Sequence, residues 1–237
     1  MQSFPTGRNL GLLIPLFGAL FWGVARAEQG WDGARQRRLD ATARAVAPPG
    51  FAYIPGGPCR LGSDDPDADS DVPPERVRFL PGFYLSRTEV TNAEYQRFRP
   101  QFHFPPGRER YPVTNLTRAE ATAYCRWRGG LLPTEQQWEK AARGTDGRRY
   151  PWGNAWRPGL CNIRSPKSRD AGLRPVGSYP ASDSPYGVQD MAGNAWEWVA
   201  DSYDGDPERG VIRGGAHAYF ERTARTYARG IEGRGVT

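Results

Sequence analysis

Cysteine and histidine are the residue types with which this sequence could bind a metal or carry out redox chemistry. The chain has three cysteines, Cys59, Cys125 and Cys161, and two histidines, His103 and His217. No two cysteines have the close spacing of a zinc or redox motif, and an odd count leaves at least one thiol without a partner in the chain. Two histidines without a neighbouring pattern of carboxylates make a poor iron or copper site. These residues therefore do not by themselves predict a metal centre.

Three Thr-x-x-Glu/Gln patterns predict where helices begin, and these helices must position any site. At residues 91–94, 117–120 and 134–137, the Thr hydroxyl and the Glu or Gln side chain can satisfy each other's backbone N–H groups, which makes a capping box. The second helix should run to about Arg128 and the third to about Gly144. Gly, Pro and aromatic residues dominate the rest, which indicates short strands and long ordered loops. The expected fold class is α+β with little regular secondary structure.

The first 27 residues have the pattern of a signal peptide. An apolar run at residues 10–24 follows a short segment with one positive charge, and residues 25–27 give the small-x-small pattern that signal peptidase cuts. The run is short for a membrane span. We therefore expect cleavage after Ala27, a periplasmic or secreted location and no stable membrane insertion; an uncleaved membrane anchor is the alternative. Residues 28–48 are rich in Arg and Ala and predict a linker or a short loose helix.

Arginine supplies nearly all of the positive charge. The net charge is +6, and the two lysines are Lys140 and Lys167. Arginine suits fixed, forked pairing with carboxylates, and no cluster of Lys and Arg alternates with aromatic residues. We therefore expect no nucleic-acid partner. The Asp-rich stretch at residues 64–71 predicts a solvated loop.

A series of motifs runs through the chain in a fixed order. They are I-P-G-G at residues 54–57, L-P-T-E-Q-Q-W-E-K-A-A-R-G at 132–144, Y-P-W-G-N at 150–154, P-V-G-S at 175–178, D-M-A-G-N-A-W-E-W at 190–198 and R-G-G at 213–215. In this order and spacing, the chain resembles the sulfatase-modifying-factor family, which includes the formylglycine-generating enzyme. The resemblance implies one domain over residues 49–237 with a formylglycine-generating-enzyme-like variant of the C-type-lectin fold, built from a few short helices and short antiparallel strands. A loop-rich domain needs aromatic mass in its core, and we expect the six tryptophans from Trp127 to Trp198 to supply it.

The C-terminus departs from the family pattern. Family members close with a G-F-R strand, often followed by a cysteine that pairs with the counterpart of Cys125. Here the chain ends in Gly235, Val236 and Thr237. Either the C-terminal strand is truncated or it is missing, and a missing strand would leave an open sheet edge and a free Cys125.

The resemblance also implies chemistry for which this chain lacks the residues. The best-known members oxidise a cysteine of a sulfatase to formylglycine, using molecular oxygen and a copper(I) ion held by two cysteines. Counted without gaps from Gly215, those cysteines correspond to Tyr219 and Ala224, and no cysteine follows Cys161. Copper(I) selects soft thiolate ligands. We therefore expect neither copper binding nor cysteine-to-formylglycine oxidase activity.

The resemblance further implies a structural calcium ion, wrapped by the segment that matches residues 190–197. Carried over by position, its ligands would be the side chains of Asp190 and Glu197 and the carbonyls of Gly193 and Ala195. Calcium takes several oxygen ligands, and main-chain carbonyls in a tight loop provide them. A salt bridge from Glu197 to an arginine is the alternative.

A second calcium loop of the family has a weaker match. It corresponds to Asn162, Ile163 and, further along, Asp170. The stretch between these residues is short here, which weakens the case for a second calcium ion.

The missing thiol pair favours an exported accessory or recognition protein without oxidase activity. Such a protein would present the groove that follows Arg213, Gly214 and Gly215 to a protein or peptide ligand. The sequence does not identify that ligand.

The alternative function is an oxygen-dependent oxidase of protein or peptide maturation that uses other groove residues. The candidates are His217, Tyr219 and Glu221, all of which follow the R-G-G motif. For His217, a structural or hydrogen-bonding role competes with a role as a ligand.

Overall fold

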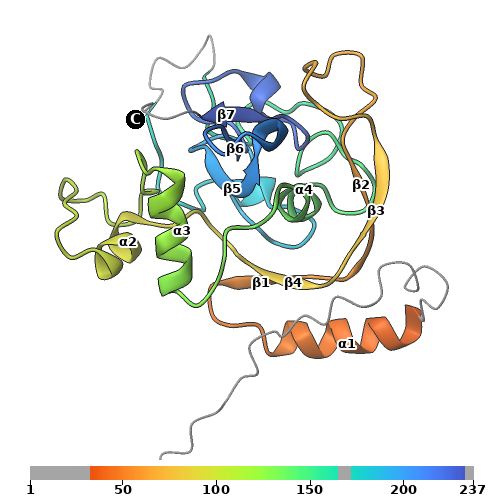
Figure 1. Ribbon diagram of the computed structural model, residues 1–237, viewed down its shortest axis with the longest axis horizontal. Coiled ribbons are helices and arrows are strands. Elements are labelled where there is room, and N and C mark those ends of the chain that lie inside the picture. The colour runs from red at the N-terminus through yellow and green to blue at the C-terminus, as the bar shows by residue number, and fades with distance from the viewer. Residues whose placement is uncertain (1–32, 165–171, 233–237) are drawn as a thin grey trace, which may run out of the picture.

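The computed structural model describes residues 33–164 and 172–232. Within them the chain forms four α-helices and seven short strands, which Figure 1 shows. In chain order they are α1 (Gly33–Ala45), β1 (Phe51–Ile54), β2 (Gly57–Leu61), β3 (Arg76–Leu80), β4 (Phe83–Ser86), α2 (Asn92–Phe98), α3 (Arg118–Trp127), α4 (Glu135–Arg143), β5 (Glu197–Ser202), β6 (Gly210–Arg213) and β7 (Gly230–Glu232). This confirms the α+β class with modest regular structure. The predicted signal peptide lies outside the described residues, and within them no helix is both long and apolar enough to span a membrane.

Helices α2, α3 and α4 begin at the predicted capping boxes. The hydroxyls of Thr91, Thr117 and Thr134 accept hydrogen bonds from the backbone N–H three residues later, and the side chain at that later position bonds back to the threonine N–H. α4 ends at Arg143, before Gly144 with a φ of 72°. A capping box determines where a helix begins because it satisfies backbone donors that the first turn leaves free.

The strands form three small antiparallel sheets. β1 pairs with β4, β2 pairs with β3, and the third sheet has the order β5-β6-β7. The pairs β1–β4 and β2–β3 curve around α4 in Figure 1. Glu197 of β5 lies opposite Arg213 of β6, so the third sheet brings the motif at residues 190–198 beside the R-G-G turn. The alternatives of a truncated or a missing closing strand concern the chain after residue 232, which lies outside the described residues.

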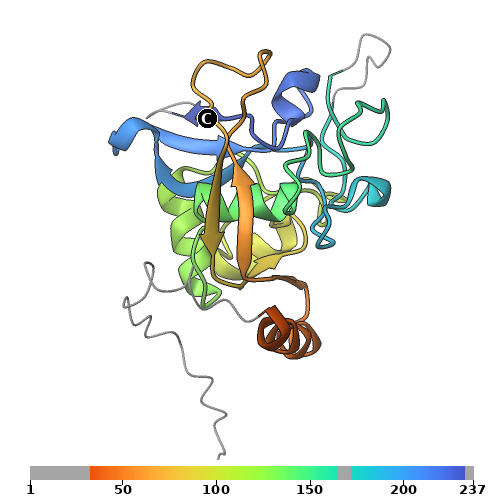
Figure 2. The ribbon, with the colours of Figure 1, turned by 90° about the vertical axis from the view of Figure 1, so that its right-hand side faces the viewer.

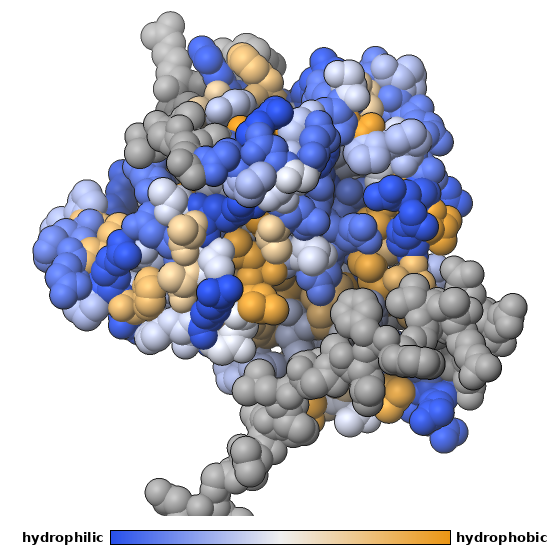
Figure 3. Space-filling model, in the orientation of Figure 1, coloured by the Kyte–Doolittle hydropathy of each residue, from blue (hydrophilic) through white to orange (hydrophobic). Residues whose placement is uncertain are grey.

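α4 contributes the centre of the hydrophobic core. Trp138, Ala141 and Ala142 are fully buried, and they pack with Ile54 of β1 and Val199 of β5. These apolar side chains recur at three- and four-residue spacing, which places them on one face of the helix. On the side of the molecule shown in Figure 3, hydrophilic residues predominate and hydrophobic ones gather near the middle.

The expectation that six tryptophans form the core is confirmed for Trp138 alone. Trp127 is 50% exposed, and the remaining four are partly buried. Two of these four bond to carbonyls at the margin of the core, Trp198 Nε1 to Leu116 at 2.7 Å and Trp152 Nε1 to a nearby carbonyl at 3.1 Å. An indole has an apolar body and one N–H that needs a partner, so the boundary between core and loops suits it better than the centre.

The segment at residues 28–48, expected to be a linker or a short loose helix, contains helix α1. Tyr53 OH donates to Asp40 Oδ1 at 2.9 Å, and Tyr84 OH donates to the Ala43 carbonyl at 2.9 Å. The two tyrosines belong to β1 and β4, so hydrogen bonds attach the helix to that sheet. Figure 2 shows α1 nearly end-on, below the strands.

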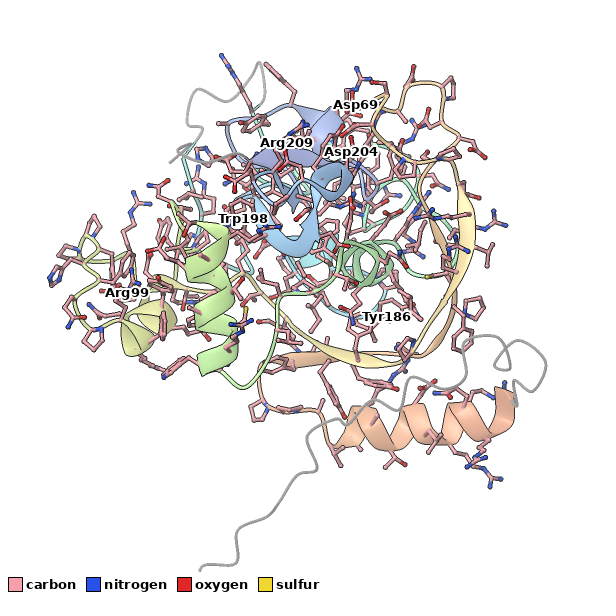
Figure 4. All side chains as sticks on the ribbon, viewed as in Figure 1. Asp69, Arg99, Tyr186, Trp198, Asp204 and Arg209 are labelled. Carbon is pink, nitrogen blue, oxygen red and sulfur yellow. The ribbon has the colours of Figure 1, made fainter. Side chains whose placement is uncertain are left out.

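The Asp-rich stretch at residues 64–71 is not simply a solvated loop. Arg149 pairs with Asp65 at 2.6 Å, and Tyr227 OH donates to the same carboxylate at 2.5 Å. Asp69, labelled in Figure 4, pairs with an arginine from the C-terminal part of the chain at 2.8 Å. These contacts hold the loop against residues that lie far from it in the sequence, with Tyr227 162 positions after Asp65. The prediction of a loop holds, and residues 64, 66, 67 and 70 are exposed. The contacts of Asp65 and Asp69 were not predicted, because the arginines that bind them are remote in the sequence.

A buried network of carboxylates and arginines ties α4 to the third sheet. Glu139 accepts hydrogen bonds from Arg143 Nη1 at 2.9 Å, from Arg213 Nη2 at 3.0 Å and from the Gly62 N–H at 2.8 Å. Arg213 also pairs with Glu135 at 3.0 Å. Buried charges are tolerated when opposite charges and hydrogen bonds surround them. The network therefore fixes Arg213, the first residue of the R-G-G motif.

Candidate functional site

The loop at residues 190–197 has a backbone that non-glycine residues seldom adopt. Asp190 and Asn194 have φ values of 56° and 63°, and Gly193 has a φ of 82°. A Cβ atom at Gly193 would lie 2.3 Å from the Asn162 carbonyl oxygen, so this close approach requires glycine. Left-handed conformations at non-glycine residues cost about 1–3 kcal/mol each and persist where the surrounding contacts hold them, often at functional sites. The loop is therefore a candidate site on its backbone geometry alone.

Asn194 holds this loop in place, and the sequence did not predict that role. Its Nδ2 donates to Glu89 Oε2 at 2.6 Å, while its Oδ1 accepts from Asn162 Nδ2 at 2.9 Å and from the Arg174 N–H at 3.0 Å. Its carbonyl accepts from the His217 N–H at 3.0 Å. One buried asparagine thus joins four segments that are far apart in the sequence. The only signal in the sequence is its place inside the motif at residues 190–198.

The structure brings together the two carboxylates predicted as calcium ligands. Asp190 Oδ2 accepts from the Gly177 N–H at 2.5 Å, and Glu197 Oε2 accepts from Trp138 Nε1 at 2.9 Å. Among the described residues, no arginine forms an ion pair with either carboxylate, so the alternative of a salt bridge from Glu197 is not found there. An indole N–H neutralises no charge, which leaves both carboxylates without a counter-charge in the described part of the chain.

Burial and the charges of neighbouring carboxylates raise the pKa values of the acids in this region. Burial raises the pKa of Glu197 from 4.5 to about 7, and the charge of Asp190 adds to the shift. Burial also raises the pKa of Asp190. The pKa of Glu89, a neighbour that the sequence did not predict, lies well above its usual value because of burial and then because of the charges of Glu197 and Asp190. The charge of Asp190 thus disfavours the ionised forms of both Glu197 and Glu89.

Several oxygen atoms of this region accept no hydrogen bond from the described residues. In the described residues, no hydrogen bond ends on the carbonyl oxygens of Gly193 and Ala195, and one oxygen each of Asp190 and Glu197 has no donor. Two carboxylates and two carbonyls are ligands of the kind that calcium takes. No cluster of three His, Cys, Asp or Glu side chains in the described ranges is arranged for a metal, so the carbonyls would have to supply part of any coordination shell.

Asn162, predicted in the second calcium loop, supports the first loop instead. Its Nδ2 donates to the Gly172 carbonyl at 3.0 Å as well as to Asn194, and its own carbonyl accepts from the Asn194 N–H at 2.8 Å. Ile163 packs against a small apolar cluster. Asp170 lies outside the described residues. A second calcium ion therefore stays a prediction.

Two exposed aromatic residues follow the R-G-G turn. Tyr219 is 48% exposed and Phe220 is 56% exposed. The Tyr219 ring meets the Trp196 ring edge-on, with centroids 5.4 Å apart, and the Arg164 guanidinium lies 5.2 Å from the centre of the Phe220 ring. The Arg164 N–H also donates to the Tyr219 carbonyl at 2.8 Å. We call the surface formed by Trp196, Tyr219, Phe220 and Arg164 the aromatic patch.

The other two groove candidates are not paired with each other. His217 is partly buried, and its Nδ1 is buried without a hydrogen-bond partner among the described residues. Glu221 Oε1 accepts from Tyr150 OH at 2.6 Å. His217 thus has a free ring nitrogen, whereas Glu221 is engaged with a tyrosine.

The two positions counted as copper ligands differ in their surroundings. Ala224 is fully buried in a small cluster with Cys161 and Ala192, whereas Tyr219 is on the surface. The sequence did not predict that a thiol would lie in the cluster around position 224. Burial raises the pKa of Cys161 to about 12, and the charge of Glu221 adds to the shift, so this thiol is neutral at physiological pH. The cluster around Ala224 therefore contains one protonated thiol. Of the described residues, the other two cysteines, Cys59 and Cys125, do not belong to this cluster.

Comparison with known proteins gives consistent matches. A family model described as "Sulfatase-modifying factor enzyme 1-like domain" matches residues 36–235. The chain is 30% identical over 227 residues to a Mus musculus protein named inactive C-alpha-formylglycine-generating enzyme 2, covering 70% of this chain and 73% of that protein. It is 30% identical over 223 residues to the formylglycine-generating enzyme of Thermomonospora curvata, covering 66% of this chain and 73% of that enzyme. The structure of PvdO from Pseudomonas aeruginosa has the same fold, with a TM-score of 0.64 at 22% identity over 78% of this chain and 88% of that one.

These matches agree with the motifs and with the geometry of the site. The family model begins within α1 and spans the capped helices, the strained loop and the R-G-G turn. The relatives include one named as inactive and one named as an active enzyme, so membership alone does not decide the activity. The chain belongs to the family of sulfatase-modifying-factor-enzyme-1-like domains.

Proposed function

We propose that this protein is an exported recognition or accessory member of its family, without cysteine-to-formylglycine oxidase activity. The observation that carries the proposal is the pair of positions where the family places its copper ligands. Position 224 is a fully buried alanine, and position 219 is an exposed tyrosine. The neighbouring thiol of Cys161 is protonated, and metals bind the thiolate form. A copper(I) clamp therefore lacks both of its sulfur ligands.

The aromatic patch suits a protein or peptide ligand. Aromatic residues and arginine dominate the binding energy of many interfaces, because they bury a large area at a small cost in side-chain entropy. The patch also rests on a rigid base, since the strand that leads into it ends at the buried Arg213. A rigid surface loses less entropy on binding. We place the ligand of the groove on this patch.

A structural calcium ion in the loop at residues 190–197 belongs to the same proposal. The ion would neutralise Asp190 and Glu197 and would hold the strained backbone between them. It would thereby fix Asn194, whose carbonyl bonds to the His217 N–H near the patch. The periplasmic or secreted location proposed for the protein would supply calcium at the concentrations that weak sites need.

An oxygen-dependent oxidase is the second candidate, and one observation favours it. The Nδ1 atom of His217 is buried without a hydrogen-bond partner in the described residues, as expected of a group that takes up a substrate proton or binds a ligand. Tyr219 is close in the sequence and exposed. Glu221 would then position Tyr150 through its hydrogen bond rather than act on the substrate.

Oxidase activity and copper binding distinguish the two candidates. The purified mature protein is incubated with copper(I) in the presence of a moderate competing chelator, and separately with a C-x-P-x-R peptide under oxygen. We expect no retained copper, no oxygen consumption and no formylglycine in the peptide by mass spectrometry. Detection of formylglycine would refute the proposal, and oxygen consumption that is lost in His217→Ala would favour the second candidate.

Ligand binding is tested by panning a displayed peptide library on the full chain. Enriched peptides should bind the Tyr219→Ala and Phe220→Ala variants at least tenfold more weakly, because each substitution removes an exposed ring of the patch. Val77→Ala is the matched control, since Val77 is an exposed apolar residue of β3 outside the patch. Equal binding to all variants would exclude the patch as the binding surface.

A further inference from the structure

A hollow of about 430 Å³ lies beside α4, and none of its lining residues belongs to the network that holds Arg213. Its walls include Pro58, Pro185 and Tyr186, and Lys140 lines it from α4. Tyr186, labelled in Figure 4, also packs against the main hydrophobic core. The volume falls within the range of sites for small molecules, and the proline and tyrosine walls are apolar. We call this space the Lys140 pocket; it shares no residue with the aromatic patch.

Lys140 is a buried cation without an acidic partner. It is 1% exposed, and its Nζ donates one hydrogen bond, to the Gly57 carbonyl at 3.1 Å. An ammonium group has three N–H donors, and buried donors are normally satisfied. The other fully buried cations of the described chain, Arg143 and Arg213, both pair with Glu139. Lys140 thus differs from its neighbours in that no described carboxylate lies within ion-pair distance.

The groups that surround Lys140 do not supply the missing charge. Burial lowers the pKa of Lys140, and the opposing effects of Cys59 and Asp40 do not offset it. Burial raises the pKa of Cys59, so this thiol is neutral. Asp40 already accepts hydrogen bonds from Tyr53 and from a glutamine of α1. The environment therefore leaves room for one more negative charge at Lys140.

A second donor of the pocket is also unused. The Tyr186 hydroxyl has no hydrogen-bond partner among the described residues, and burial raises the pKa of this tyrosine, which keeps it a donor. Arg148, at the rim, does not add a free charge, because its guanidinium bonds to Asp146 and to the Pro151 carbonyl. The pocket therefore offers one cation and one hydroxyl donor beside apolar walls.

We propose that the Lys140 pocket binds a small organic monoanion, a carboxylate with a compact apolar body. The carboxylate accepts hydrogen bonds from Lys140 Nζ and Tyr186 OH, and the apolar body lies between Pro58 and Pro185. A doubly charged inorganic anion fits less well, because a single lysine would balance half of its charge and the proline walls offer it no donors.

The proposal is tested with benzoate as the probe, on the full chain. Its neutral counterpart benzamide, acetate and inorganic phosphate separate the roles of charge, apolar body and anion type. Isothermal titration calorimetry should show saturable binding of benzoate, with benzamide, acetate and phosphate each at least tenfold weaker. Lys140→Met should weaken benzoate binding at least tenfold and Tyr186→Phe about threefold. Arg78→Met is the control and should bind as the wild type does, since Arg78 is an exposed cation of β3.

A second measurement keeps the proposal falsifiable if Lys140→Met does not fold. The chain has two lysines, so protein labelled with carbon-13 at lysine Cε gives two NMR signals, which Lys167→Met assigns. Benzoate should shift the Lys140 signal alone and should raise the pH at which it titrates, because a bound anion stabilises the ammonium form. Unchanged Lys140 signals at saturating benzoate, or equal affinity for benzoate and benzamide, would overturn the proposal. Phosphate binding as tight as that of benzoate would overturn its organic part.

Discussion

Glu197 is a carboxylate whose nearest polar partner is an indole N–H, and whose neighbours Asp190 and Glu89 are also acids. An ionised cluster of this kind is unfavourable unless a cation or protons compensate it. At the residue scale, the calcium proposal rests on this imbalance. It also rests on the unused carbonyl oxygens of the same loop.

Calcium should raise the stability of the wild type, and Glu197→Gln should remove the effect. At a calcium concentration about 100 times its dissociation constant, mass action adds about 2.7 kcal/mol to the free energy of unfolding. The variant keeps the shape of the side chain and loses its charge, so its melting temperature should be equal in chelator and in millimolar calcium. Differential scanning calorimetry provides the measurement.

Asp64→Asn is the control for this experiment. Asp64 is an exposed member of the Asp-rich loop that accepts a hydrogen bond from the Glu75 N–H. Its variant should retain the full response to calcium. A response kept in Glu197→Gln and lost in Asp64→Asn would place the ion in the Asp-rich loop, and no response in the wild type would exclude a site of useful affinity.

Restoring cysteines at positions 219 and 224 tests whether the groove keeps the geometry of a copper site. The Tyr219→Cys, Ala224→Cys double variant should bind copper(I) at least a hundredfold more tightly than the wild type, because two thiolates replace a ring and a methyl group. Competition with a copper(I) chelator measures the affinity. The double serine variant is the matched control and should bind no better than the wild type; equal affinity of the two variants would show that the positions do not converge.

At the element scale, the Asp-rich loop at residues 64–71 packs against the C-terminal part of the chain, and we call this loop the strap. The hydrogen bond from Tyr227 lowers the pKa of Asp65 below 3.8, and the charge of Arg149 contributes. A carboxylate with a lowered pKa adds stability above its ordinary pKa, and that stability is lost as the pH falls through the lowered value. The strap should therefore loosen in acid.

Asp65→Asn should remove part of the acid sensitivity of the fold. Between pH 5 and pH 3, the free energy of unfolding of the wild type should fall by on the order of 1 kcal/mol more than that of the variant. Urea titrations at the two pH values give the comparison. Asp67→Asn, which removes an exposed carboxylate of the same loop, should follow the wild type, and a variant at 65 with the wild-type slope would contradict the role of this pair.

The elements that could be predicted from the sequence are those whose causes are local. Thr91, Thr117 and Thr134 each bond to a residue three positions away, so the starts of α2, α3 and α4 followed from the sequence alone. The strap could not be predicted, because Asp65 and Tyr227 are 162 positions apart. The position of α1 depends in the same way on tyrosines of β1 and β4.

At the scale of the whole molecule, Glu139 connects α4, β6 and the turn after β2. Glu139→Gln should cost about 3–5 kcal/mol in the free energy of unfolding, because it leaves the buried charges of Arg143 and Arg213 poorly balanced. Asp69→Asn is the matched control, since Asp69 pairs with the half-exposed Arg222 outside this network and should cost less than about 1 kcal/mol. Urea denaturation measures both, and similar costs at the two positions would refute the central role of Glu139.

The family could be predicted from the order of its motifs along the chain, whereas the calcium ligand set of the strained loop stays a prediction. The hydrogen-bond partners of that loop could not be predicted, because Glu89 meets Asn194 across 105 positions and no local pattern records that contact. The burial of Ala224 beside Cys161 could not be predicted from the sequence for the same reason. Long-range packing decides which chemically capable residues meet.

The hydrogen bonds of Asn194 have a consequence for the order in which the protein is made. A ribosome releases the chain from the N-terminus, so Glu89 emerges long before the asparagine that binds it, and His217 emerges last of the partners. Until then no hydrogen bond from Asn194 offsets the cost of burying the Glu89 carboxylate, so the segment around it stays exposed to solvent. Closure of the site is therefore a late event of biosynthesis, and a chaperone that binds the nascent chain has the whole interval from residue 89 to residue 217 in which to act.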